Sequence, residues 1–162
     1  MQLRDATEAD LPAIVAIYNT TIPSRMVTAD PDPVSVESKL SWFRAHTPDR
    51  RPLWILDEDG TIAAWLSFND FYGRPAYHPT AEISVYVAEA YRRRGLGRQL
   101  LDEAIRRAPD LRLKTLLAIV FAHNEPSLRL LEGAGFQRWG FLPAVAEMDG
   151  IEYDDVILGR RV

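Results

Sequence analysis

Residues 82–101 have the sequence EISVYVAEAYRRRGLGRQLL. Apolar Ile83, Val85 and Val87 alternate with more polar neighbours and are all β-branched, which is typical of a strand. Within residues 96–108 the apolar side chains recur at the spacing of one helix face. The stretch therefore predicts a strand, a turn and a helix, and the other elements can be placed relative to it.

The predicted turn combines arginines with two glycines, in the spacing Arg-x-x-Gly-x-Gly from Arg92 to Gly97. The first N–H groups of a helix have no partner within it and carry the positive end of its dipole, and bare glycine backbone lets an anion approach them. The dinucleotide fingerprint Gly-x-Gly-x-x-Gly is absent, and no Gly-Lys-Ser/Thr follows as a nucleotide P-loop requires. We therefore predict a phosphate-binding turn in which Gly95 and Gly97 leave room for the anion. The alternative is an ordinary helix start with an exposed charge run.

Length and composition indicate one domain over residues 1–162, with 47% apolar and 26% charged residues. The chain has no cysteine, which excludes disulfides and thiolate metal sites, and its three scattered histidines predict no metal site. Without an apolar run of about 18 residues or a signal-like N-terminus, we expect a cytoplasmic protein with no membrane segment. The formal net charge of −4 argues against nucleic acid as a partner, so the arginines of the turn suit a small anionic ligand.

The N-terminal half predicts strands and amphipathic helices separated by turn signals. A capping box, Thr7 to Asp10, begins the first helix, and three prolines interrupt the chain before the second. The acidic run that ends in Asp59-Gly60 favours a tight turn between antiparallel strands. In chain order the expected elements are a strand at 1–5, a helix from Thr7 through Tyr18, a loop at 20–33, a helix from Val36 that ends before Pro48, and strands at 53–56 and 62–68.

The C-terminal half predicts a buried strand, a short helix and a closing hairpin. Thr115–Phe121 is apolar on both faces, which is typical of a fully buried strand. Asn124 stands where a helix cap would, and glycines follow the helix that it begins. Strands at 136–147 and 152–161 are joined at Met-Asp-Gly. Because a helix connects the strands at 83 and 115, we expect those two to be parallel within a mixed α/β sheet.

Four separated segments together resemble the N-acetyltransferases of the GNAT superfamily, and in particular the phosphinothricin acetyltransferase-like branch, which acetylates small amino-acid analogues. They are LRDATEADL at 3–11 with IYN at 17–19, the strand EISVYV, the turn RRRGLG, and NEPSLRLLEGAGF at 124–136. The resemblance covers nearly the whole chain. It implies a single-domain α/β fold with a mixed, mostly antiparallel central sheet flanked by helices. It also implies acetyl-CoA as co-substrate, a small-molecule amine as acceptor, and a homodimer.

The resemblance also implies roles for particular residues. Glu82 would be the general base, because an alkylammonium with a pKa of about 10.4 must lose a proton before it attacks a thioester. A solvated residue at a strand start is the alternative for Glu82, and a plain helix cap is the alternative for Asn124. The residues implied to hold the coenzyme are Val85, Tyr86 and Val87 along the pantetheine arm, Arg92, Arg93, Arg94, Gly95, Leu96, Gly97 and Arg98 around the pyrophosphate, and Asn124 and Ser127 on the far side.

One position departs from the family pattern. Leu131 stands where many members have a tyrosine that is proposed to protonate the leaving thiolate, and leucine cannot donate a proton. Tyr86, Tyr153 or a water would take this role, or the thiolate leaves unassisted.

The aromatic segment 69–80 leads directly into the strand that begins near Glu82, and such loops often carry specificity. Arg74 and Tyr77 are therefore candidate acceptor contacts, because a guanidinium can hold a carboxylate or phosphinate by two hydrogen bonds; alternatively, both are surface residues. Two other functions remain open. One is a protein or peptide N-acetyltransferase, and the other is a non-catalytic acyl-CoA-binding module, which Leu131 would suit.

Overall fold

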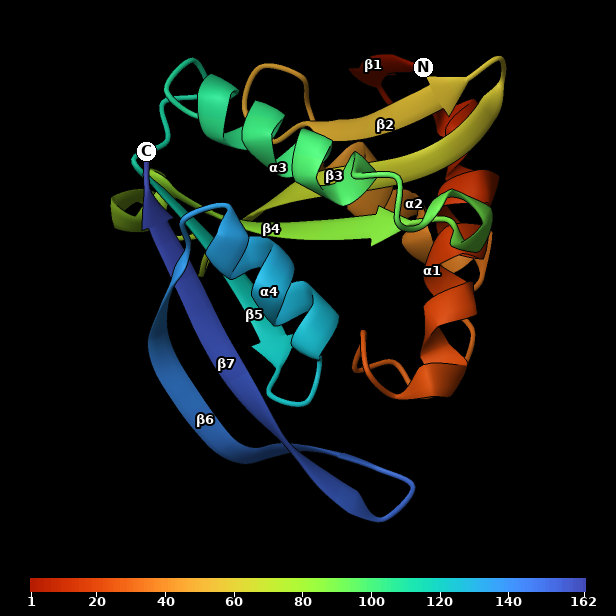
Figure 1. The fold of residues 1–162 in the computed structure, drawn as a ribbon. Coiled ribbons are helices and arrows are strands. Elements are labelled where there is room, and N and C mark those ends of the chain that lie inside the picture. Colours follow the sequence, from red (N-terminus) through yellow and green to blue (C-terminus); the bar gives the residue numbers. More distant parts are fainter.

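Seven strands form one open sheet in the order β1-β2-β3-β4-β5-β7-β6, in a computed structural model that describes residues 1–162 (Figure 1). All neighbouring strands are antiparallel except β4 and β5, which are parallel as predicted. The mixed, mostly antiparallel sheet is thus confirmed. The strands are β1 (Gln2–Asp5), β2 (Leu53–Glu58), β3 (Thr61–Asp70), β4 (Thr80–Val87), β5 (Thr115–Phe121), β6 (Gln137–Met148) and β7 (Ile151–Arg161).

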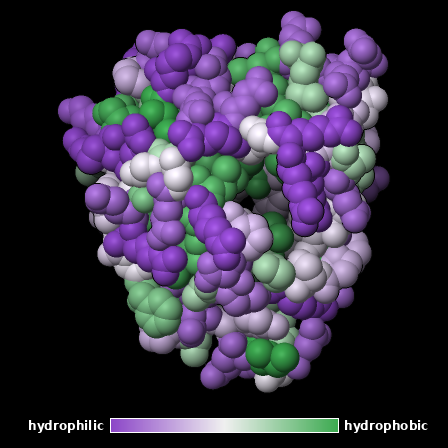
Figure 2. Space-filling view, in the orientation of Figure 1, coloured by the Kyte–Doolittle hydropathy of each residue, from purple (hydrophilic) through white to green (hydrophobic).

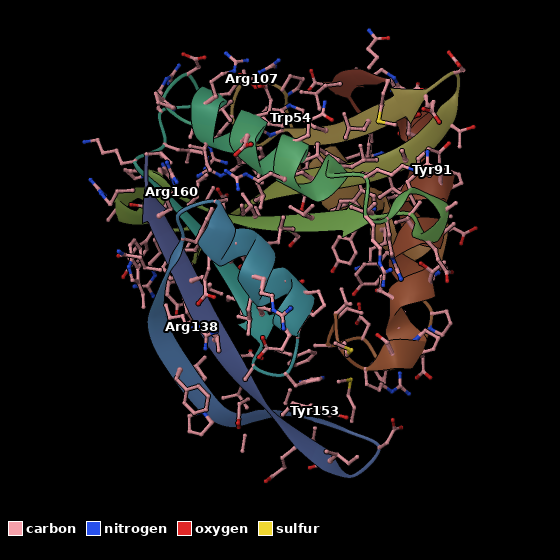
Figure 3. The ribbon with its side chains drawn as sticks, viewed as in Figure 1. Trp54, Tyr91, Arg107, Arg138, Tyr153 and Arg160 are labelled. Atoms are coloured by element: carbon pink, nitrogen blue, oxygen red, sulfur yellow. The ribbon has the colours of Figure 1, made fainter.

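Two helices cover each face of the sheet (Figure 1). The helices α1 (Leu11–Thr21) and α2 (Val36–Arg44) pack on one face, where a small apolar cluster forms around Ile14 and Trp65. The helices α3 (Leu96–Arg107) and α4 (Glu125–Gly133) pack on the other face over the main core. Arg107 of α3 lies over the ring of Trp54 at 5.3 Å, where it covers the edge of this core (Figure 3). No helix is long and apolar enough to cross a membrane.

The start of α1 follows the predicted capping box. The Thr7 N–H donates to the Asp10 carboxylate at 2.7 Å, and Arg4 of β1 pairs with the same carboxylate at 2.7 Å. Residues 8–10 form a 3₁₀ turn (Glu8–Asp10) before the helix proper. The prediction of a loop from residue 20 was wrong at its start, because α1 runs to Thr21 and a second 3₁₀ turn (Ile22–Ser24) extends it.

β4 and β5 diverge after a short paired region. Their register is Thr80↔Thr115, Ala81↔Leu116 and Glu82↔Leu117, and no pair follows although both strands continue. The prediction that β5 is fully buried was wrong for this reason. Ile119 lies beyond the last pair, beside the gap between the strands, and is 42% exposed. The divergence therefore leaves one edge of β4 unpaired from Ser84 onward.

The hairpin of β6 and β7 projects below the body of the molecule (Figure 1). Asp149 and Gly150 form its tight turn with φ of 55° and 74°, as the Met-Asp-Gly prediction requires. Arg25 reaches from the end of α1 to the Asp149 carboxylate at 2.8 Å. This ion pair links the hairpin tip to the face of the sheet that carries α1.

Candidate active site

The turn before α3 presents unpaired backbone donors. No N–H from Arg93 to Arg98 donates a hydrogen bond to a protein atom, and the first helical bond is Gln99 N–H to the Gly95 carbonyl at 3.0 Å. Gly95 has a φ of +77° and Arg93 a φ of +61°, which curl the backbone of the turn. Such a concave row of donors at a helix N-terminus suits a phosphate group. The turn therefore fits the pyrophosphate that the sequence predicted there.

The arginine side chains of the turn differ in their contacts. Arg92 and Arg93 are exposed and form no ion pair, whereas Arg94 lies over the Tyr91 ring at 4.9 Å. Arg98 donates to Asp102 and to the Gly133 carbonyl, both at 2.8 Å, so its side chain joins α3 to the end of α4. Its backbone N–H and its Nη2 group have no partner in the protein and remain available to a phosphate.

Gly97 has a different role from the one predicted. A Cβ atom at this position would lie 3.1 Å from Leu130 Cδ2 and 3.8 Å from the side chains of Val85 and Val87. Its missing side chain therefore faces inward, where it lets α3 pack closely against β4 and α4. The prediction that the missing side chain of Gly97 leaves room for an anion was wrong, because a Cβ atom there would point toward Leu130. At Gly95, by contrast, nothing lies within 4 Å of the place that a Cβ atom would occupy.

A cavity of about 70 Å³ occupies the gap between β4 and β5. Figure 2 shows this side of the molecule hollowed between α4 and the region of α1. Asn124 is 4% exposed, and its Oδ1 accepts from the Ser127 N–H at 3.3 Å, so it caps α4 as well as lining the cavity. Of the residues predicted to hold the coenzyme, those that line the cavity are Val85, Tyr86, Asn124 and Ser127; Val87 does not.

A second cavity, of about 190 Å³, lies between the sheet and the helices α1 and α2. Ser84 and Tyr86 of β4 line both cavities, so the two meet at the middle of that strand. The resemblance to the GNAT acetyltransferases implies that these two helices form one wall of the acceptor site, whereas the residues that line this cavity were not predicted from the sequence. The remaining lining residues are Ile14, Val15, Tyr18, Val34, Lys39, Trp42, Trp65, Ser67 and Asn69.

Glu82 lies on the face of β4 that also carries Ser84 and Tyr86, because side chains alternate along a strand. It is paired across the sheet with Asn69, which lines the larger cavity. Its carboxylate is half-buried and forms no hydrogen bond or ion pair with the protein. Burial raises the pKa of Glu82 above its usual value. Glu82 lines neither cavity, but its unpaired carboxylate precedes Ser84 on the same face of β4, next to the residues where the cavities meet.

The predicted acceptor contacts lie elsewhere. Arg74 is exposed and forms no ion pair, and Tyr77 is 41% exposed with its ring edge-on to Phe71 at 5.7 Å. Neither lines either cavity. Arg51 holds both ends of this aromatic segment, since it donates to Asp70 at 2.8 Å and to the His78 carbonyl at 2.9 Å.

The structure also distinguishes among the residues that were considered as proton donors to a leaving thiolate. Leu131 is 6% exposed and lines the gap between β4 and β5, where it offers no donor. Tyr86 lines both cavities, and burial raises the pKa of its hydroxyl, which makes it a weaker acid than an exposed tyrosine. Tyr153 packs against Phe121 and His123 toward the hairpin tip and lines neither cavity (Figure 3).

Comparison with known proteins gives a consistent match. The sequence model of the acetyltransferase (GNAT) family matches residues 14–136. YwnH of Bacillus subtilis, to which phosphinothricin acetyltransferase activity is provisionally assigned, is 55% identical over 100% of this chain and 99% of its own. The L-methionine sulfoximine/L-methionine sulfone acetyltransferase of Pseudomonas paraeruginosa is 33% identical over 91% of this chain and 87% of its own. The crystal structure of a phosphinothricin acetyltransferase from Sinorhizobium meliloti in complex with acetyl-CoA superposes with a TM-score of 0.91, at 28% identity, over 99% of this chain and 88% of that one.

Proposed function

The chain belongs to the GNAT acetyltransferase family, whose enzymes use acetyl-CoA, and from this premise we propose that it acetylates the primary amine of a small amino acid or amino-acid analogue. The analogues we have in mind are of the phosphinothricin and methionine sulfoximine kind, which the names of its relatives contain. One observation carries the proposal. The gap between β4 and β5 and the cavity under α1 and α2 meet at Ser84 and Tyr86, with the free carboxylate of Glu82 on the same face.

The residues present suit acetyl-CoA. The unpaired N–H groups from Arg93 to Arg98 can receive a pyrophosphate, and the unpaired edge of β4 beyond Glu82 can receive the amides of a pantetheine arm. When bound, acetyl-CoA supplies the acetyl group as a thioester. The N–H groups along this edge would be the backbone donors that stabilise negative charge on the thioester carbonyl oxygen.

Glu82 would act on the acceptor as general base. An alkylammonium has no lone pair at neutral pH, so a proton must leave before nitrogen attacks. A carboxylate with a raised pKa is suited to hold that proton, directly or through a water. Tyr86 is the tyrosine best placed to donate a proton to the departing thiolate, since it alone of the two candidates lines both cavities.

The size of the acceptor cavity supports a small substrate. Cavities for drug-sized ligands measure roughly 300–1,000 Å³, whereas this one is about 190 Å³ and is walled by two tryptophans and two tyrosines. A protein or peptide N-terminus would need an open groove. The small volume therefore favours an amino-acid acceptor over the peptide alternative.

The test is a screen for thiol release from acetyl-CoA in the presence of different amines. L-Phosphinothricin, L-methionine sulfoximine, ordinary amino acids, polyamines, aminoglycosides and peptides would be compared at equal concentration. We expect the highest kcat/KM for one of the amino-acid analogues. A preference for peptides would move the protein to the peptide-acetylating alternative, and coenzyme binding without turnover on any amine would leave only the non-catalytic alternative.

A further inference from the structure

The cavity under α1 and α2 contains a single charged side chain, Lys39 of α2. Its ammonium lies 5.5 Å from the centre of the Tyr18 ring, and no carboxylate lies within 4 Å of it. The nearest candidate, Asp30, accepts instead from the Tyr18 hydroxyl, which also contacts Thr28. The positive charge of Lys39 is thus not neutralised by the protein.

The other polar groups of this cavity include no charged acceptor and leave a hydroxyl donor free. The Trp42 indole donates to Asn69 Oδ1 at 3.3 Å, and Asn69 Nδ2 donates to the Ser67 hydroxyl at 3.1 Å. The side-chain amide is therefore occupied on both sides, while the Ser67 hydroxyl keeps its proton to donate. An unpaired ammonium and an unpaired hydroxyl together favour a negatively charged group.

We propose that Lys39 is a specificity-determining residue that binds the carboxylate of the amino-acid acceptor. This inference rests on the proposed function and identifies the carboxylate as the part of the acceptor that the cavity recognises. In an α-amino acid the amine is one carbon away from the carboxylate, so an acid held under α2 leaves the amine near Ser84, where the cavities meet. Arg74, the cation predicted from the sequence, is exposed and lies outside the cavity lining.

The experiment compares two acceptors that differ only in the acid: L-methionine sulfone and its decarboxylated amine, 3-(methylsulfonyl)propan-1-amine. Lys39→Met keeps the length of the side chain and removes its charge. We expect its KM for methionine sulfone to rise roughly 10- to 100-fold, with little change for the decarboxylated amine.

The control is Lys114→Met, which alters the chain's other lysine, an exposed residue outside both cavities. It should leave both acceptors unaffected. Circular dichroism and coenzyme affinity by calorimetry check that each variant is folded. Wild-type activity on methionine sulfone with an unchanged KM in Lys39→Met overturns the inference and leaves the proposed function standing. So does a selective rise in KM in Arg74→Ala alone. Absence of wild-type activity on any amino acid or analogue refutes the proposed function itself.

Discussion

Glu82 is a half-buried carboxylate with no partner, and burial raises its pKa. A group with a raised pKa holds a proton more readily in the folded protein, so it becomes a stronger base at the pH where it is still ionised. The same burial raises the free energy of the ionised carboxylate. Proteins keep such unpaired buried charges at sites where the charge takes part in a reaction.

We predict that Glu82→Gln lowers turnover at pH 7 by roughly 10²–10⁴-fold while coenzyme affinity stays nearly constant. In the wild type, kcat/KM should fall as pH drops through the raised pKa of Glu82, because the protonated carboxyl cannot accept a proton. The variant should lack this acidic limb and recover partly at high pH, where more of the acceptor amine is already neutral. A pH profile of both proteins measures these effects.

The matched control for this prediction is Glu147→Gln, which changes an exposed glutamate on β6. It should retain wild-type turnover and pH profile. Retention of both by Glu82→Gln as well would assign Glu82 a structural role.

The two glycines of the turn before α3 have different structural roles. Gly95 adopts a left-handed backbone conformation, and the space that its side chain would occupy is open. Gly97 packs closely against Leu130. Only Gly95 therefore tests the turn as an anion site, because a change at Gly97 disturbs the contact between α3, β4 and α4.

We predict that Gly95→Ala weakens coenzyme binding by tenfold or more, which is about 1.4 kcal/mol. The methyl group itself meets nothing, but the left-handed conformation costs about 1–2 kcal/mol for alanine and the turn relaxes away from its curled form. Calorimetric titration with coenzyme A measures the change.

Gly60 provides a matched control, because it has a φ of +87° and equally open surroundings in the turn between β2 and β3. Gly60→Ala should lose similar stability in thermal unfolding but keep its coenzyme affinity. Equal affinity losses in the two variants would show that general destabilisation, and not the turn, is responsible.

The spacing of apolar residues was sufficient to predict the strands and helices of the sheet, because each of these elements depends on local sequence. It could not predict that β4 and β5 separate after Glu82 and Leu117, since that divergence depends on tertiary packing and leaves no mark in the sequence of β5. The exposure of Ile119 follows from it and was missed for the same reason. The packing of Gly97 against Leu130 and the hydrogen bond from Arg98 to the Gly133 carbonyl likewise depend on how α3 sits against α4.

The sequence likewise predicted only those parts of the candidate site that depend on a local motif. The motif around Arg92 to Gly97 predicted a phosphate-binding turn, and the unpaired donors there support it. Lys39 and Trp65 carry no motif, and they come together only because α2 and β3 enclose one cavity. Arg74 had a local aromatic context, yet the structure leaves it exposed.

At the scale of the whole molecule, β6 is an edge strand with large apolar side chains in solvent. Those that are at least 39% exposed are Trp139, Phe141, Leu142 and Val145. Bulges after Arg138 and Leu142 and the missing N–H of Pro143 blunt this edge for strand pairing. An apolar patch of this kind marks a surface for side-chain packing with another protein.

We propose that β6 packs against a second copy of this chain, and we predict that Phe141→Glu shifts the protein from dimer to monomer in light scattering coupled to size exclusion. A charge buried in an apolar interface without a partner is strongly unfavourable. Tyr72→Glu, at a tyrosine that is 75% exposed in the aromatic segment, is the control. A monomeric wild type would refute the proposal, and loss of the dimer only in Tyr72→Glu would place the interface there instead.

The short pairing of β4 with β5 divides the sheet into two leaves, β1–β4 and β5–β7, which are also consecutive in the chain. Three residue pairs join the leaves along their common edge, and the core under α3 and α4 joins them on one face. A ligand in the gap would add a further connection, and one that binds only the folded protein adds about 2.7 kcal/mol of stability at one hundred times its dissociation constant. The protein saturated with acetyl-CoA would then resist unfolding better than the free protein.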